Sequence, residues 1–175
     1  MKPTRNLAGP IGFISLLLLF EPALANPKLS HEAAVKHEQG TSFSITSQMA
    51  QTMVDAAVRA AREKDFAIVV SIVDKHGNLK LFHRMDNTSS GSIQVSQLKA
   101  STSAQFPVST KALAERSAGL PGNPYGSIPG FLLLEGGLPI MNKDDVHIGG
   151  IGISGATPEL DAQFAQAAID ELGEI

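Results

Sequence analysis

The sequence predicts an α+β domain with five strands and with helices before, between and after them. Apolar residues recur at helical spacing from Ile45 onward and again after Pro158, whereas short apolar runs bounded by turn residues indicate strands. The chain is organised around residues 136–156, where six glycines leave one face of two strand-like runs almost without side-chain bulk. Another element, a helix or a flat ligand, can therefore approach this backbone closely.

The first 25 residues have the layout of a secretory signal peptide. Lys2 and Arg5 form a short positive region, Leu7 to Phe20 an apolar one, and Ala23-Leu24-Ala25 a small-x-small cleavage site. The apolar run is shorter than the roughly 20 residues that span a bilayer, which favours a cleaved leader over an uncleaved membrane anchor. We therefore expect a signal peptide over 1–25 and a periplasmic or secreted protein.

One domain is expected after the leader. Residues 26–43 are polar, contain His31 and His37 and show no sustained apolar period, so they predict a flexible lead-in before a domain at 44–175. The chain has no cysteine, which excludes disulfides and thiolate metal sites. Its 14 basic and 17 acidic residues, no tryptophan and a single tyrosine argue against nucleic-acid binding.

The first elements are a helix and a hairpin. Residues 47–64 predict a helix that Thr46 or Ser47 caps and whose apolar stripe packs on a sheet. Residues 66–73 form a near-continuous apolar run, typical of a central strand covered on both faces. Turn residues then lead into 79–85, where side chains alternate, and this indicates a hairpin. His83 shares its face with apolar residues, where a neutral imidazole needs a partner.

A second helix is expected from the cap Ser92 through Phe106. Lys99, Thr102 and Phe106 lie on one side of it, because they are spaced three and four residues apart. A lysine beside a threonine and an aromatic residue can bind an anion or a carboxylate, although a helix lysine is more often a solvated surface residue.

The remaining chain predicts a short helix, a long loop, three strands and a final helix. The helix runs from Ser109 to Arg116, and the glycine- and proline-rich segment after it is an ordered loop or a lid. Tyr125 on this loop either carries function or pins the loop to the core. The strands are expected at 131–135, 138–141 and 146–154, and the final helix at 158–172. Asp161 lies in its first turn, where an acid favours the helix dipole.

Several catalytic and cofactor motifs are absent or lack the required context. Gly150, Gly152 and Gly155 fit the G-x-G-x-x-G pattern, but no βαβ unit surrounds them, and this excludes a dinucleotide site. No H-E-x-x-H motif and no histidine pair at i, i+4 occurs in the folded part, so a dedicated zinc site is weakly supported. Ser154 lies in Gly-Ile-Ser-Gly rather than G-x-S-x-G and is not a nucleophile elbow.

Five short motifs stand in a characteristic order between residues 44 and 172. They are Val73-Asp74-Lys75-His76-Gly77, Arg84-Met85-Asp86, Lys99-Ala100 with Thr102, Gly136-Gly137-Leu138-Pro139-Ile140 and Gly150-Ile151-Gly152-Ile153-Ser154-Gly155-Ala156. Together they resemble the GlcG/HbpS family, the haem-degrading or haem-binding domain, and segment 128–137 is especially similar to its extracellular haem-binding branch. Asn87 and Ser101 depart from the common pattern, since many relatives have a glycine and an aromatic residue there.

The resemblance implies a profilin-like domain whose mainly antiparallel, five-stranded sheet is flanked by helices, similar to the corrinoid adenosyltransferase C-terminal domain. It also implies a closed homo-oligomer such as an octamer, and binding of haem or a related tetrapyrrole in iron handling or in sensing with a membrane sensor partner. The export signal favours this association over the glycolate-utilisation association of other family members.

A flat macrocycle needs close backbone approach and apolar walls, and its propionates need a cation. On this basis the candidate cofactor-binding residues are Arg84, Lys99, Thr102, Phe106, Phe131, Gly136 and Gly137, with Arg116 as a further cation. The candidate ligands of haem iron are His83, Tyr125, His147 and Met85. No residue is assigned a catalytic role, and a binding protein is favoured over an enzyme.

Two other functions stay open. One is an enzyme or binding protein for a small organic acid, in which Lys99 and Arg84 hold a carboxylate and Asp86 or Asp74 acts as base. The other is an oligomeric, non-catalytic accessory protein that contacts a membrane-bound sensor or transporter.

Overall fold

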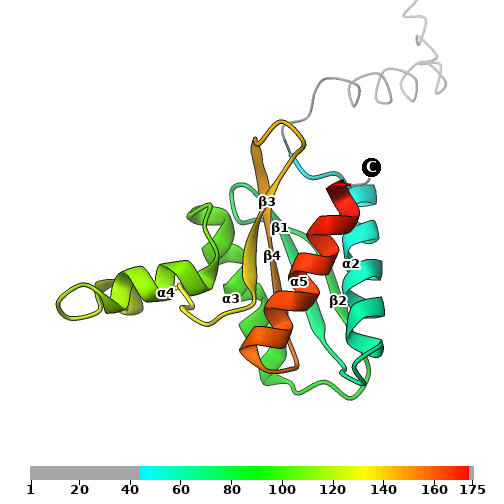
Figure 1. Ribbon diagram of the computed structural model, residues 1–175, viewed down its shortest axis with the longest axis horizontal. Helices are drawn as coiled ribbons and strands as arrows, with labels where there is room; N and C mark the ends of the chain where they lie inside the picture. The colour runs from blue at the N-terminus through cyan, green and yellow to red at the C-terminus, as the bar shows by residue number, and fades with distance from the viewer. Residues whose placement is uncertain (1–43, 174–175) are drawn as a thin grey trace, which may run out of the picture. The chain divides into compact units, whose positions relative to one another are not determined.

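The structure is a computed structural model that describes residues 44–173, so the predicted signal peptide and lead-in lie outside the described residues. The described part is a mixed α and β domain (Figure 1). Its elements are α2 (Ser47–Arg62), β1 (Val69–Asp74), β2 (Leu79–Arg84), α3 (Gly91–Gln105), α4 (Thr110–Ala118), the 3₁₀ helix η2 (Pro124–Ser127), β3 (Gly137–Met141), β4 (His147–Ser154) and α5 (Pro158–Gly173). The predicted α+β class is confirmed.

The strands form one antiparallel sheet in the order β2-β1-β4-β3. Helix α3 covers one face of the sheet, and α2 and α5 lie side by side over the other (Figure 1). The main core lies on the α2 and α5 side and includes Met53, Ile72 and Phe164. β1 is an inner strand, as the apolar run over 66–73 predicts, whereas Pro139 fits β3 because an edge strand tolerates a residue without an N–H.

The sheet has four strands, so the prediction of a fifth strand at 131–135 is wrong. The main chain of this segment bonds to threonine side chains from helices instead of to a neighbouring strand. The Leu132 N–H donates to Thr102 Oγ1 at 2.9 Å, and Thr110 Oγ1 donates to the Leu134 carbonyl oxygen at 2.7 Å. These two bonds hold the segment against the helices, and it does not join the sheet.

Helix α3 packs directly on the glycines of β3 and β4. A Cβ atom added to Gly152 would lie 2.1 Å from the Ser96 carbonyl oxygen, and one added to Gly150 would lie 2.5 Å from that of Ala100. Both distances are far below normal van der Waals contact, so only glycine fits at these positions. The element that approaches the glycine-rich face is therefore a helix.

Two features of the α3–α4 region complete the fold. Helix α3 begins at Gly91, and the predicted cap Ser92 is wrong because Ser90 occupies the N-cap position. Helix α4 begins as predicted, since Ser109 Oγ accepts a hydrogen bond from the Ala112 N–H, and it extends away from the sheet together with η2 (Figure 1). Across residues 44–173, no helix combines the length and the apolar character needed to cross a membrane.

Candidate functional site

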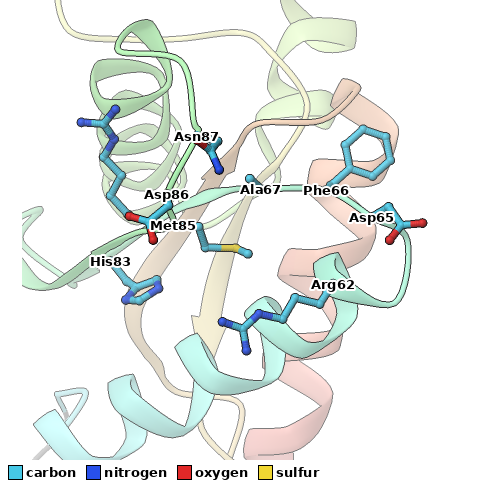
Figure 2. Close-up of a pocket in the computed structure, with 9 residues that line it drawn as sticks. Arg62, Asp65, Phe66, Ala67, His83, Met85, Asp86 and Asn87 are labelled. Atoms are coloured by element: carbon cyan, nitrogen blue, oxygen red, sulfur yellow. The ribbon is translucent and has the colours of Figure 1, made fainter.

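A pocket of about 460 Å³ lies where the end of α2 meets the end of β2 (Figure 2). This volume is within the range of roughly 300–1,000 Å³ typical of ligand sites. The lining comes from two short segments, 62–67 and 83–87. Phe66, Ala67 and Met85 supply apolar surface, and the Met85 sulfur also accepts a hydrogen bond from the Ile68 N–H at 3.4 Å. Of the predicted site residues, the pocket brings together His83, Arg84 and Met85.

His83 faces the pocket because of the alternation of side chains along β2. It pairs with Val70 of β1, whose side chain belongs to the core on the α2 and α5 side of the sheet, so both point to that side. The imidazole is half-buried and makes no hydrogen bond with another residue in the described range. One ring nitrogen is thus free to accept a hydrogen bond or to bind a metal ion.

Two arginines line the same pocket. Arg62, the last residue of α2, is exposed, and Figure 2 shows its guanidinium directed toward the side of the pocket where His83 lies. Within residues 44–173 it has no ion-pair partner. Arg84 is held by Thr88, to whose Oγ1 and carbonyl oxygen it donates at 2.8 and 3.0 Å. Sequence reasoning missed Arg62, because only the fold brings the end of α2 beside β2.

The two loops that border the pocket each contain a non-glycine residue with positive φ. These are Asp65, at φ 61°, and Asn87, at φ 63°. The left-handed region is unfavourable for residues with a Cβ atom, and such residues are enriched at ligand sites. The backbone on both sides of the pocket is therefore held in a shape that costs stability.

Replacing Asp65 by glycine is expected to stabilise the domain by about 0.5–1 kcal/mol, because glycine adopts this φ without strain. Thermal or urea unfolding measures the change. The matched control is Asp55→Gly in the exposed middle of α2, which should destabilise the domain by a similar amount. A destabilised Asp65→Gly variant would show that the carboxylate, and not the backbone strain, governs stability at this position.

A buried ion pair joins α3 to α5. The Lys99 Nζ donates to Asp161 Oδ2 and to the Ile153 carbonyl oxygen, both at 2.8 Å, and Asp161 Oδ1 accepts from the Ala156 N–H at 3.0 Å. Only 1% of Lys99 and 2% of Asp161 is exposed. Burial lowers the pKa of Lys99 and raises the pKa of Asp161, while the attraction between the two charges opposes both shifts. The Lys99 ammonium is thus fully engaged inside the domain.

Gly136, Gly137 and Thr102 belong to this same buried region. A Cβ atom on Gly136 would lie 2.7 Å from the Lys99 Nζ, and one on Gly137 2.5 Å from the Lys99 carbonyl oxygen. Thr102 is buried and bonds to segment 131–135. The structure therefore does bring Lys99, Thr102 and the glycine pair together, as a packing centre between α3 and the sheet.

The other predicted site residues lie apart from the pocket. The Phe106 and Phe131 rings meet edge to face, with centroids 5.1 Å apart, beside the region that carries α4. Tyr125 lies in η2, and its N–H donates to Ser117 Oγ. His147 Nε2 lies 2.8 Å from the Gly149 carbonyl oxygen at the start of β4. Among residues 44–173, no three histidine, aspartate or glutamate side chains are grouped so that they could hold a metal ion.

Comparison with known proteins gives consistent matches over this domain. The family model described as haem degrading protein HbpS-like matches residues 45–170. An uncharacterised 15.0 kDa protein of the dhaT–dhaS intergenic region of Citrobacter freundii is 32% identical, over 75% of this chain and 94% of its own length.

Two solved structures share the fold. A crystal structure of an HbpS double mutant from Streptomyces reticuli is 34% identical, covers 78% of this chain and 92% of its own, and has a TM-score of 0.70. A crystal structure of a PduOC–haem complex is 30% identical, covers 73% of this chain and 94% of its own, and has a TM-score of 0.66.

Proposed function

The chain belongs to the HbpS-like family of haem-degrading proteins, and from this membership we propose that it is an exported protein that binds haem or a related tetrapyrrole in the pocket beside His83. The observation that carries the proposal is the pocket itself, which both His83 and Arg62 line. Within residues 44–173, the half-buried His83 has no hydrogen-bond partner and Arg62 has no ion-pair partner. The haem complex of PduOC, a domain of the same fold, supports the choice of ligand.

The residues of the pocket fit the needs of a tetrapyrrole. His83 is suited to bind the iron, because a neutral imidazole nitrogen is a common axial ligand. Arg62 is suited to pair with a propionate, because a guanidinium offers a carboxylate two parallel hydrogen bonds. Phe66, Ala67 and Met85 give the macrocycle an apolar contact. Bound haem would supply the redox and ligand-binding chemistry of its iron.

Titration with hemin tests this assignment. The wild-type chain should bind with a saturable shift of the Soret band, and His83→Ala should weaken binding at least tenfold because the iron loses its ligand. Arg62→Ala should weaken it less, by roughly the 1.5- to 5-fold effect of one exposed ion pair. The matched control is His76→Ala in the exposed β1–β2 turn, which should bind like the wild type.

A His83→Ala variant with unchanged affinity and an unchanged Soret band would exclude His83 as the ligand. Tyr125→Phe and His147→Ala then decide whether Tyr125 or His147, two of the three other predicted iron ligands, takes this role. No saturable binding by the wild type would exclude the function as a whole.

A small organic acid is the second candidate ligand, because Arg62 and Arg84 line the same pocket and both can hold a carboxylate. Asp86, which also lines the pocket, is the base that such an enzyme would use. Thermal stabilisation by glycolate that disappears in Arg62→Ala, without any hemin binding by the wild type, would favour this function.

Export and assembly complete the proposal. The signal-peptide pattern of residues 1–25 supports a periplasmic or secreted location. Exposed apolar side chains in the α4 region, Phe106, Leu120, Ile128 and Leu134, support a homo-oligomer, for which light scattering gives the mass. A membrane sensor is the partner we propose for this oligomer, and co-purification from the envelope tests that contact.

A further inference from the structure

The β1–β2 hairpin exposes apolar side chains on the sheet face opposite the His83 pocket. Leu79 pairs with Val73 and Phe82 with Ser71, and Val73 and Ser71 both contact α3, so Leu79 and Phe82 point to the α3 side. Helix α3 packs mainly on β1, β3 and β4 and leaves this face of β2 open. As a result Leu79 is 55% exposed and Phe82 37% exposed.

The same hairpin has a net positive charge, because Lys75, Lys80 and Arg84 outnumber Asp74, whose carboxylate accepts hydrogen bonds from the turn. Lys75, Lys80 and Arg84 are exposed, and no acidic residue occurs between positions 75 and 85 or anywhere in α3. None of the three forms an ion pair within residues 44–173, and Arg84 bonds only to the neutral Thr88. The whole chain has a net charge of -3, so the charge of this cluster is opposite in sign to that of the whole chain.

We propose that this hairpin surface, formed by Lys75, Leu79, Lys80 and Phe82, docks on an anionic lipid surface. Lysine and arginine near a membrane are attracted by anionic headgroups, and exposed aliphatic and aromatic side chains insert at the boundary between headgroups and acyl chains. The hairpin offers both kinds of side chain in adjacent positions. Docking by this face leaves the His83 pocket, on the other side of the sheet, open to solvent.

An acidic strand from a partner protein fits the hairpin less well than a membrane does. β2 is an edge strand, but its register with β1 shifts between Ile72 and Val73, which leaves Lys80 without a paired residue. The bulge increases the twist of the edge strand, and the lysine places a charge on it. Both features discourage the addition of another strand. Lipid headgroups do not pair with the main chain of β2, so the register shift does not hinder their binding.

Co-sedimentation of the mature chain, which begins at Asn26 after the predicted leader, with vesicles tests the proposal. At low salt, binding to phosphatidylcholine vesicles that contain phosphatidylglycerol should exceed binding to pure phosphatidylcholine by about thirtyfold, the ratio expected for two cations at the surface. Lys75→Glu/Lys80→Glu should lose most of this preference. The control Lys64→Glu/Lys143→Glu changes two other exposed lysines by the same total charge and should keep it.

A second pair of variants tests the apolar part. Leu79→Ser/Phe82→Ser should bind anionic vesicles several-fold more weakly while the thermal midpoint and the hemin titration stay as in the wild type. Equal vesicle binding by Lys75→Glu/Lys80→Glu and its control would overturn the proposal. So would binding to soluble polyglutamate with no binding to anionic vesicles, since that result would indicate an acidic protein partner.

Discussion

Lys99→Met is expected to destabilise the domain by about 3–5 kcal/mol, because it leaves the buried Asp161 carboxylate without a counter-charge. This is a large fraction of the roughly 5–15 kcal/mol that stabilises a typical domain. Urea unfolding at neutral pH measures the loss. Methionine keeps most of the side-chain volume, so the effect reports the lost charge more than a cavity.

The double variant Lys99→Met/Asp161→Leu is the control. It should recover most of the lost stability, because replacing a whole buried ion pair by apolar side chains is often neutral. A double variant as unstable as the single one would show that the bonds from Lys99 to the Ile153 carbonyl oxygen and from Asp161 to Ala156 outweigh the ion pair.

The loss in Lys99→Met should also depend on pH. Burial already raises the pKa of Asp161, and removal of the ammonium removes the group that opposes this shift. A carboxyl whose folded pKa is raised favours the folded state below its unfolded pKa of about 3.9 and loses that contribution as pH rises. The difference between Lys99→Met and the wild type should therefore shrink toward pH 4. A difference that is constant with pH would contradict the assignment to Asp161.

Gly152→Ala is the second substitution with a large expected effect. The new Cβ atom would lie 2.1 Å from the Ser96 carbonyl oxygen and 2.4 Å from the Ala100 nitrogen, both of them main-chain atoms of α3. The helix must move away from the sheet to make room, and overpacking of this kind costs about 3 kcal/mol or more.

Thermal unfolding checks this expectation against Gly173→Ala. Nothing lies within 4 Å of a Cβ atom at Gly173, so that variant should stay within about 0.5 kcal/mol of the wild type. A Gly152→Ala variant as stable as Gly173→Ala would mean that α3 is not packed on β4 as closely as the structure describes.

The local patterns of the sequence were sufficient to predict most elements. The helical period predicts α2 within two residues of its observed end, and the apolar run over 66–73 predicts an inner strand that is buried on both faces. The glycine positions predict a close approach at β4. These features depend on neighbours along the chain, so one sequence is enough to predict them. The ordered motifs predict the family, which the match to residues 45–170 confirms.

The partners of buried polar groups come from distant parts of the chain, and only the tertiary structure decides them. Asp161 looks like a first-turn residue that favours a helix dipole, yet it is buried and pairs with Lys99, 62 positions away. Segment 131–135 has the composition of a strand, but threonines of α3 and α4 take its main-chain bonds. In the sequence, Arg62 looks like an ordinary cation at the end of a helix. In the structure, it lines the same pocket as His83.

The sequence by itself therefore determined the class of the domain, the order of its helices and of the four strands that form, its family and the glycine face that a neighbour must approach. The tertiary structure decided that the neighbour is helix α3, that Lys99 is enclosed with Asp161, and that His83 and Arg62 share one pocket. The physical reason is range. Periodicity and turn chemistry act over a few residues, whereas burial and ion pairing depend on which distant segments the fold brings into contact.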